Sequence, residues 1–293
     1  MKTLMIVTVF APLLGFAAGN TPEERTVNLS PKTIETAKAA NKLILVASRG
    51  ANVPAIFGNE HVAKFVESHF VVERQSKGSG RGSYLIYNHD GELIHEVAND
   101  PYPYELAVKI KRALQPETQY YTLLSRFNAG ERGADLLENL IVGATDADDA
   151  KNAPRLMQAY LESLPAEASD AQLRFLAKHT SRSSDPGFAV LLEKGAHLEK
   201  LAELIFQEEF TPHLQDREVD AMKIAERVKD RYPHRALAQP IDRMAVELLE
   251  MREDWAALET VLPAYLDTYR TQLSPEMIGY YQWLSDTHLT NHQ

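Results

Sequence analysis

The feature that most constrains the fold is a change of hydrophobic pattern near residue 115. Before it, over residues 31–114, short apolar runs alternate with segments whose apolar residues recur every three or four positions. After it, no segment shows a convincing strand pattern, and the apolar residues recur at helical spacing. The sequence therefore predicts a mixed α/β part followed by an all-α part.

In the first part, the predicted elements come in the order helix, strand, helix, strand, hairpin and helix. Their sequences are PKTIETAKAANK, LILVAS, FGNEHVAKFVESHF, FVVERQ, SYLIYN with ELIHEV, and PYELAVKIKRAL. LILVAS is a continuous apolar run, which is typical of a strand buried on both faces of a parallel or mixed sheet. Asp90-Gly91 predicts a tight primed turn in the hairpin, because this pair tolerates positive φ angles. This order predicts a small mixed sheet with helices on both faces.

The second part consists of helical stripes separated by prolines and loops. The clearest stripe places these residues on one face: Trp255, Leu258, Leu262, Tyr265, Leu266 and Tyr269. The helices follow one another in pairs, as in a tetratricopeptide-type (TPR-like) array, although no strict period or full consensus is present. We therefore expect an α/β domain over residues 20–115 and an α-helical repeat-like domain over residues 116–293.

The first 19 residues have the pattern of an export signal. Lys2 is followed by an apolar core at residues 4–16 and then by small residues, which predicts cleavage near Gly19-Asn20. A membrane anchor is the alternative, but the apolar run is shorter than the roughly 20 residues that span a bilayer, and Pro12 interrupts it. The expected location is the periplasm or the exterior, with no membrane insertion after cleavage.

Composition bears on several classes of function. The chain has 41 acidic and 31 basic residues, a formal charge of −10, which argues against nucleic-acid binding because phosphates require a basic surface. The chain contains no cysteine, so its own residues cannot carry out thiol exchange or thiolate catalysis. The ten histidines show no metal-binding spacing. We therefore predict neither a metal site nor another cofactor.

Three segments together resemble the thioredoxin-like family, in particular its exported bacterial branch with a helical C-terminal extension. They are AKAANKLILVAS, IFGNEHVAKFVESHFV and SYLIYNHDGELIHEV, the last with its Asp-Gly turn, and they cover about residues 28–115. In the helical part, FNAGERGADLLENLIVGA and DPGFAVLLEKG are similar to segments of the same extended proteins. The resemblance implies a thioredoxin-like domain followed by helical repeats.

The chain departs from this family at its active site. SRGANVPA (residues 48–55) stands where the family has a Cys-x-x-Cys motif, and this region is shorter than the family's by about two helical turns. Gly82-Ser83 stands where the family has a cis-proline. We therefore expect a redox-inactive protein with no catalytic residues.

Four residues at this edge are candidates for binding. Arg49 and Arg81 are expected on neighbouring loops, with Asn52 and Ser83 nearby, and the two guanidinium groups are suited to gripping a carboxylate or phosphate. Free amides near Asn52, at a helix start, would add to such an anion site. The alternative is a pair of ordinary solvated loop arginines.

These observations favour an exported protein- or peptide-binding or scaffold module of the bacterial cell envelope. One alternative is a holdase-like chaperone or an accessory subunit of a thiol–disulfide system, and another is a non-redox enzyme that reuses the thioredoxin cleft. Aromatic residues in PYPYE (residues 101–105) and in the cluster Tyr280, Tyr281 and Trp283 are candidate anchors for a partner. Packing against a neighbouring helix is the other interpretation of both.

Overall fold

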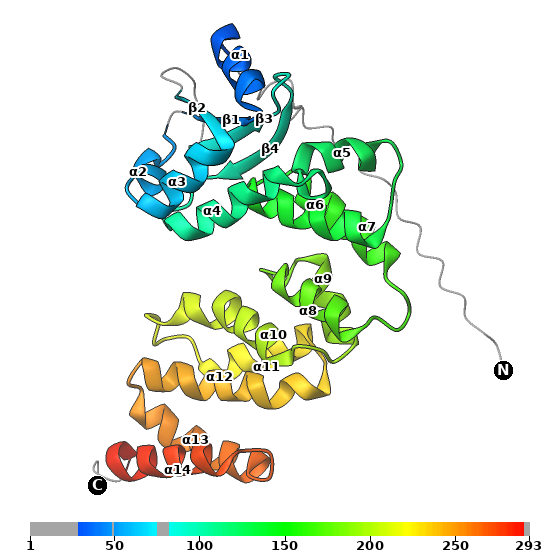
Figure 1. The fold of residues 1–293 in the computed structure, drawn as a ribbon. Helices are drawn as coiled ribbons and strands as arrows, with labels where there is room; N and C mark the ends of the chain where they lie inside the picture. Colours follow the sequence, from blue (N-terminus) through cyan, green and yellow to red (C-terminus); the bar gives the residue numbers. More distant parts are fainter. Residues whose placement is uncertain (1–28, 49, 75–81, 290–293) are drawn as a thin grey trace, which may run out of the picture. The chain divides into compact units, whose positions relative to one another are not determined.

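The computed structural model describes residues 29–48, 50–74 and 82–289, and the chain forms two compact units, residues 1–153 and 154–293 (Figure 1). Among the described residues, all strands belong to the first unit, and the second is helical. The change from mixed to helical structure therefore falls where the sequence predicts it. The division between units comes later, because helices α5 (Tyr120–Asn128) and α6 (Ala134–Asp146) pack against the sheet of the first unit.

A four-stranded mixed sheet in the order β2-β1-β3-β4 forms the centre of the first unit. The strands are β1 (Leu43–Ala47), β2 (Phe70–Arg74), β3 (Ser83–Tyr87) and β4 (Leu93–Ala98). Strand β1 runs parallel to β2 and antiparallel to β3, and β3 runs antiparallel to β4. The central residues of β1 are fully buried, as expected for a strand covered on both faces.

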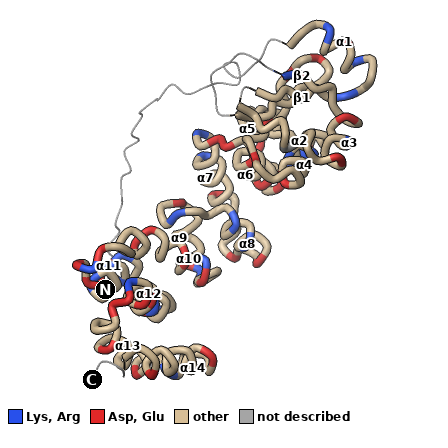
Figure 2. The backbone as a smooth tube through the Cα atoms, turned by 90° about the vertical axis from the view of Figure 1, so that its left-hand side faces the viewer, with Lys and Arg blue, Asp and Glu red and all other residues tan. Residues whose placement is uncertain are grey.

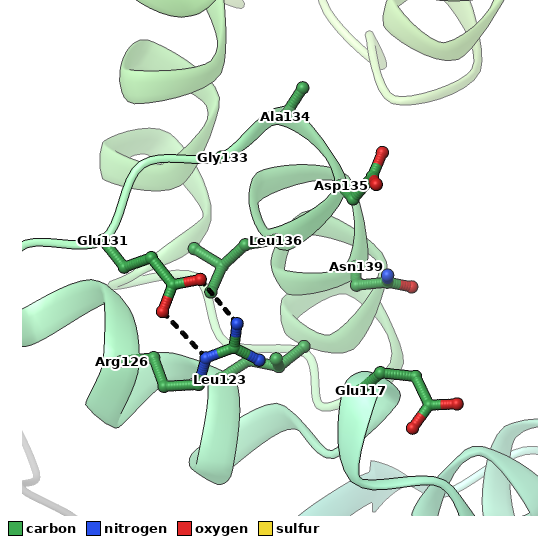
Figure 3. Close-up of a pocket in the computed structure, with 9 residues that line it drawn as sticks. All are labelled: Glu117, Leu123, Arg126, Glu131, Gly133, Ala134, Asp135, Leu136 and Asn139. Carbon is green, nitrogen blue, oxygen red and sulfur yellow. Dashed lines mark hydrogen bonds and ion pairs between the residues drawn. The ribbon is translucent and has the colours of Figure 1, made fainter.

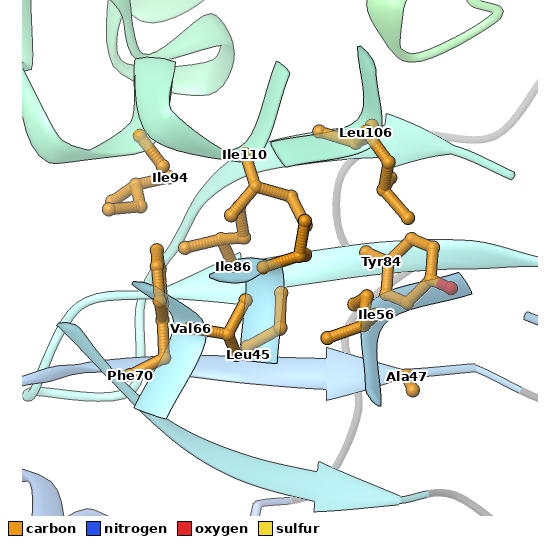
Figure 4. Packing of buried hydrophobic residues seen from close by; sticks show 13 residues of the cluster. Leu45, Ala47, Ile56, Val66, Phe70, Tyr84, Ile86, Ile94, Leu106 and Ile110 are labelled. Atoms are coloured by element: carbon orange, nitrogen blue, oxygen red, sulfur yellow. The ribbon is translucent and has the colours of Figure 1, made fainter. Parts of the chain in front are cut away.

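Helices cover both faces of this sheet, which confirms the predicted α/β arrangement. Helix α1 (Pro31–Ala40) packs on one face, over a cluster that contains Ile44, Val46 and Tyr87. Helices α2 (Val53–Phe57), α3 (Glu60–His69) and α4 (Pro103–Lys111) supply residues to the core on the other face. Figure 4 shows this larger core, in which side chains of β1 and β3 meet side chains of the three helices.

Local signals in the sequence set the ends of these helices. The Ser30 side chain accepts a hydrogen bond from the Thr33 amide (3.1 Å), and Pro31 occupies the first helical position, as predicted. Asn41, in the left-handed conformation, ends the helix. Asn59 begins α3 by accepting hydrogen bonds from the two following turn amides, those of His61 and Val62.

The hairpin between β3 and β4 is present, but the predicted primed turn at Asp90-Gly91 is wrong. Of these two residues only Gly91 has a positive φ (+87°). The Asn88 amide donates to the Glu92 carbonyl (2.9 Å), and the Asn88 side chain accepts from the amides of Asp90 and Glu92. The Gly91 amide also donates to the Asn88 carbonyl (3.1 Å), so Asn88 organises a longer loop through both its backbone and its side chain.

The second unit is built from consecutive short helices. The helix predicted from the clearest apolar stripe is confirmed as α13, with Leu258, Leu262 and Tyr265 buried. Pro263 lies inside α13 and is exposed. The α-helices are α7 (Ala153–Ser163), α8 (Asp170–Lys178), α9 (Pro186–Glu193), α10 (Leu198–Ile205), α11 (Ala221–Arg231), α12 (Ala238–Met251), α13 (Trp255–Tyr269) and α14 (Pro275–Leu284).

A buried arginine fixes one connection of this unit. Arg252, at the end of α12, is 3% exposed and donates three hydrogen bonds to main-chain carbonyls: two to His213 and one to Val219. These carbonyls belong to the segment between α10 and α11. The guanidinium fork therefore ties that segment to the end of α12.

Candidate functional site

The edge at which the sequence places the candidate site is formed by the end of β1 and the start of β3. Just past β1, the Ser48 amide donates to the Ser83 carbonyl (3.0 Å), and the Ser83 amide donates to the Ser48 hydroxyl (2.8 Å). Ser83, a predicted binding residue, therefore has its main-chain polar groups engaged within the protein. It ties the two strands together at this edge.

Gly82 lies directly against the loop that follows β1. A Cβ atom at Gly82 would lie 2.2 Å from the Gly50 carbonyl oxygen and 2.6 Å from the Ala51 nitrogen, so only glycine fits. Gly50 itself has a φ of +90°, which glycine adopts most easily. The two loops therefore meet backbone to backbone, with no room for a side chain between them.

Asn52 is brought to the same edge by its main chain. Its amide donates to the Asn99 side-chain oxygen (2.8 Å), and the Asn99 amide donates to the Gly82 carbonyl (3.0 Å). The Ala51 amide donates to the Ser48 carbonyl (3.0 Å). The amides of Ala51 and Asn52 are thus used within the protein and are not free for an anion.

Of the four predicted binding residues, the structure therefore describes only two. The structure brings Asn52 and Ser83 together, whereas Arg49 and Arg81 lie outside the described residues. Asn99, which joins the two loops, was missed by the sequence analysis. The available signal was an asparagine between the end of a strand and an Asp-Pro pair, a composition typical of side-chain to backbone hydrogen bonds in turns.

Next along the chain, the start of α4 exposes a group of large apolar side chains. Tyr102, Tyr104 and Val108 are 64%, 61% and 66% exposed. Their backbone is nevertheless fixed, because Asp100 accepts from the Tyr102 amide (2.9 Å) and from the Lys109 ammonium (2.6 Å). We call these three residues the α4 patch; Tyr102 and Tyr104 belong to the PYPYE segment named above as a candidate partner anchor, and Val108 lies one turn further along α4.

Asp100 remains charged in this position. Burial by itself raises its pKa, but the hydrogen bonds from Lys109 and the Tyr102 amide outweigh burial and hold the pKa below its usual value. The start of α4 is therefore held by an ionised carboxylate at neutral pH.

A buried polar cluster joins β4 to α5. The Tyr121 hydroxyl donates to Glu96 (2.6 Å), and the Tyr120 amide donates to His95 Nδ1 (3.0 Å). His95 and Glu96 are neighbours in a strand and point to opposite faces of the sheet, so the hydrogen bonds from Tyr120 and Tyr121 reach β4 on both faces. We call these two hydrogen bonds the tyrosine clasp. The Tyr120 hydroxyl also donates to Asp149 (2.9 Å).

His95 is neutral at physiological pH. Burial and the nearby Arg112 guanidinium lower its pKa to about 4, and the Lys109 carbonyl acts in the opposite direction. Because Nδ1 accepts the Tyr120 amide, the ring proton resides on Nε2. With a depressed pKa, full burial and a main-chain partner, His95 is suited to holding structure rather than to proton transfer with an external substrate.

An open pocket of about 380 Å³ lies at the start of α6 (Figure 3). Arg126 and Glu131 pair across one side of it, and this pairing lowers the pKa of Glu131. The nine lining residues include carboxylates, an amide and a guanidinium but no hydroxyl, imidazole or thiol. They are Glu117, Leu123, Arg126, Glu131, Gly133, Ala134, Asp135, Leu136 and Asn139. This lining can hold a small polar group but offers no nucleophile with an adjacent base.

Within the part of the chain that the structure describes, no three potential His, Asp or Glu ligands come together as a metal site. Within the same residues, none of the helices combines the length and apolar character needed to cross a bilayer.

Comparison with known proteins gives no family assignment. No family model matches the sequence, and neither a curated protein nor a solved structure matches it. The features of the molecule that bear on its function are therefore the edge, the α4 patch and the surfaces of the second unit.

Proposed function

We propose that this protein is an exported, redox-inactive module of the bacterial cell envelope that binds a protein or peptide. In this proposal the first unit is a degenerate thioredoxin-like domain, and the second is a TPR-like helical repeat. The four-stranded mixed sheet with helices on both faces is compatible with the first assignment, and the run of short paired helices is compatible with the second.

The closed edge is the observation that carries the proposal. The edge at which the resemblance places a thiol active site is held shut by the bonds between Ser48 and Ser83 and by the contact of Gly82 with Gly50. The chain also contains no cysteine with which to use such a site. Binding to an outer surface therefore fits better than chemistry in a cleft, and the α4 patch next to this edge offers a fixed apolar surface for it.

A site-specific crosslinking experiment tests the proposal. A photoreactive phenylalanine analogue replaces Tyr104 in the full chain, which is expressed in its own cells and irradiated. We expect a discrete crosslinked product that contains one protein partner, identified by mass spectrometry. The same analogue at Lys32, an exposed position on α1, is the control. Equal, diffuse crosslinking from both positions would contradict a dedicated binding module.

A holdase-like chaperone is the second candidate, and one observation favours it. Large apolar side chains are exposed on both units: Tyr102, Tyr104, Val108, Met251, Tyr280 and Trp283. A chaperone would use such surfaces for many unfolded clients. The purified protein would then suppress aggregation of several unrelated heat-denatured proteins, whereas a dedicated binding module would not.

A further inference from the structure

We infer that the C-terminal surface of the second unit, formed by α12, α13, α14 and the turn Ser285–Leu289, binds a basic, lysine- or arginine-containing segment of the partner. This inference rests on the proposed function, because it names the chemistry of the partner and the surface that would hold it. Three observations converge on it: a continuous row of aromatic rings, a concentration of negative charge, and a pocket at one end of the row.

Seven rings form a continuous row across α13, α14 and the final turn, and we call them the aromatic row. Each ring contacts the next, with centroid separations between 4.3 and 6.0 Å. In order along the row, they are Trp255, His288, Trp283, Tyr280, Tyr281, Tyr265 and Tyr269. At its start, Trp255 and His288 stack almost parallel, at 4.3 Å and 12°.

Some rings of the aromatic row are buried in the core, and others are exposed at the surface. Tyr265 and Tyr281 are buried, whereas Trp283 and Tyr280 are 54% and 43% exposed. Met251, at the end of α12, is 57% exposed. Tyr280 contacts the buried Tyr281, and Trp283 contacts Tyr280 and His288, so these ring contacts reduce the side-chain entropy that a partner would remove by ordering the exposed rings.

Carboxylates border the exposed rings. The Tyr280 hydroxyl donates to Glu250, and the Tyr269 hydroxyl donates to Asp242 (2.6 Å). Asp242 also accepts from the Lys229 ammonium (2.6 Å), which neutralises its charge, whereas the donor to Glu250 is the uncharged Tyr280 hydroxyl. The aromatic surface near Tyr280 is therefore negative.

The charge of the whole segment has the same sign. Residues 238–289 contain nine acidic and three basic residues, a net charge of −6 out of −10 for the chain. Of the three arginines, Arg252 is buried and Arg243 lies 3.2 Å from Glu247, which leaves Arg270 at the surface. The acidic positions recur along α12, α13 and α14 (Figure 2). This surface complements a basic partner and repels an acidic one.

A pocket of about 380 Å³ lies at the Trp255 end of the row. Three carboxylates line it together with Trp255, namely those of Glu253, Asp254 and Glu259. Its one basic lining residue, Arg217, donates to the Arg252 carbonyl, and the three carboxylates outnumber this single guanidinium, so the lining as a whole is negative. A lysine or arginine side chain entering this pocket would meet carboxylates and an indole, which is the combination that stabilises a cation next to an aromatic ring.

Charge decides between a basic segment and other occupants of the row. A purely apolar partner would bury the bordering carboxylates without an opposite charge, which costs free energy. A nucleic acid or an acidic segment would add like charge to a surface that is already negative. A basic segment with apolar residues satisfies both the rings and the carboxylates.

Selection from a random-peptide library displayed on phage, with the full chain as bait, tests the inference. We expect the selected peptides to be enriched in lysine and arginine. The strongest of them, made with a fluorescent label, should bind about tenfold more weakly to Trp283→Ala and to the double variant Glu253→Gln/Glu259→Gln, measured by anisotropy. Added salt should weaken binding as well, because screening acts on exposed charges.

Matched variants keep this test specific. Phe206→Ala removes a partly exposed aromatic side chain outside both proposed binding surfaces, and Glu167→Gln/Glu193→Gln removes two exposed carboxylates elsewhere in the second unit. Neither control should change the affinity of the basic peptide. A circular dichroism melt of each variant confirms that it is folded.

Failure of this inference can be distinguished from failure of the proposed binding function. Selected peptides that lack basic enrichment, or that bind Trp283→Ala as tightly as the unchanged chain, would overturn this inference and leave the proposed binding function standing. Equal loss of affinity in the control variants would also overturn it. A library that yields no binding peptide, together with no discrete crosslink from Tyr104, would overturn both.

Discussion

Glycine at position 82 determines how closely the two loops of the closed edge approach each other. The sequence showed that a proline expected from the resemblance is missing here, but it did not show what the glycine is for. The structure supplies the reason, since any Cβ atom would collide with the Gly50 carbonyl. Close backbone contacts of this kind depend on two segments distant in sequence, so no local pattern predicts them.

Replacing this glycine should therefore destabilise the protein. Gly82→Ala must push the two loops apart, and we expect it to lower the free energy of unfolding by about 1–3 kcal/mol. Urea unfolding measures the change. Gly133→Ala is the matched control, because a Cβ there meets nothing within 4 Å. Equal stability of the two variants would show that the loops are not in contact.

A second residue-scale prediction concerns His95. Its pKa is about 4 in the folded protein and about 6.5 in an unfolded chain, so the unfolded state takes up a proton first as the pH falls. The stability that depends on neutral His95 is thus fully present above pH 6.5 and is lost as the pH falls from about 6.5 to about 4. The loss amounts to about 3 kcal/mol.

Urea unfolding of the unchanged chain and of His95→Gln over this pH range tests the assignment. The difference in stability between the two should shrink on acidification, because only the unchanged chain has His95 to protonate. His61→Gln, at an exposed histidine, should keep the full pH dependence. A difference between the unchanged chain and His95→Gln that stays constant with pH would refute the role of His95.

At the scale of elements, periodicity predicted most helices and strands, because burial of one face dictates the spacing of apolar residues. Helix α13 and the strands β1 to β4 follow directly from such patterns. The pattern failed where polar side chains organise the backbone. Asn88 shapes the hairpin loop, and Arg252 ties the segment before α11 to the end of α12. Neither role depends on a repeating spacing of apolar residues, so neither can be predicted from periodicity.

The Arg252 connection gives a prediction at this scale. Arg252→Met removes three hydrogen bonds and leaves the carbonyls of His213 and Val219 without their donor, so we expect a loss of about 3 kcal/mol in the free energy of unfolding. Amide hydrogen exchange should rise in the segment between α10 and α11. Arg270→Met, at an exposed arginine, should change neither quantity.

At the scale of the whole molecule, the sequence correctly separated a mixed part from a helical part, but the first compact unit extends further, to residue 153. The reason is that α5 and α6 of the all-α segment both pack against β4, and Tyr120 and Tyr121 of α5 also hydrogen-bond to His95 and Glu96. Tertiary contacts of this kind are invisible to element patterns. The exposed surfaces proposed for binding were anticipated from the sequence only as aromatic clusters, because exposure depends on the packing of neighbouring helices.

Two fragments test this division. We expect residues 20–153 to unfold cooperatively by themselves, because they contain both the sheet and the helices that cover β4. Residues 20–115 should fail to do so, because removal of α5 and α6 leaves His95 and Glu96 without their tyrosine partners. Circular dichroism melts of the two fragments measure the difference, and equal cooperativity would place the boundary at residue 115.

The tyrosine clasp between α5 and β4 has a consequence for solubility. A strand at the margin of a sheet is a template on which another molecule can add its own strand and start aggregation. Because α5 lies along β4 and is held there by hydrogen bonds, intermolecular strand addition is blocked on that side of the sheet.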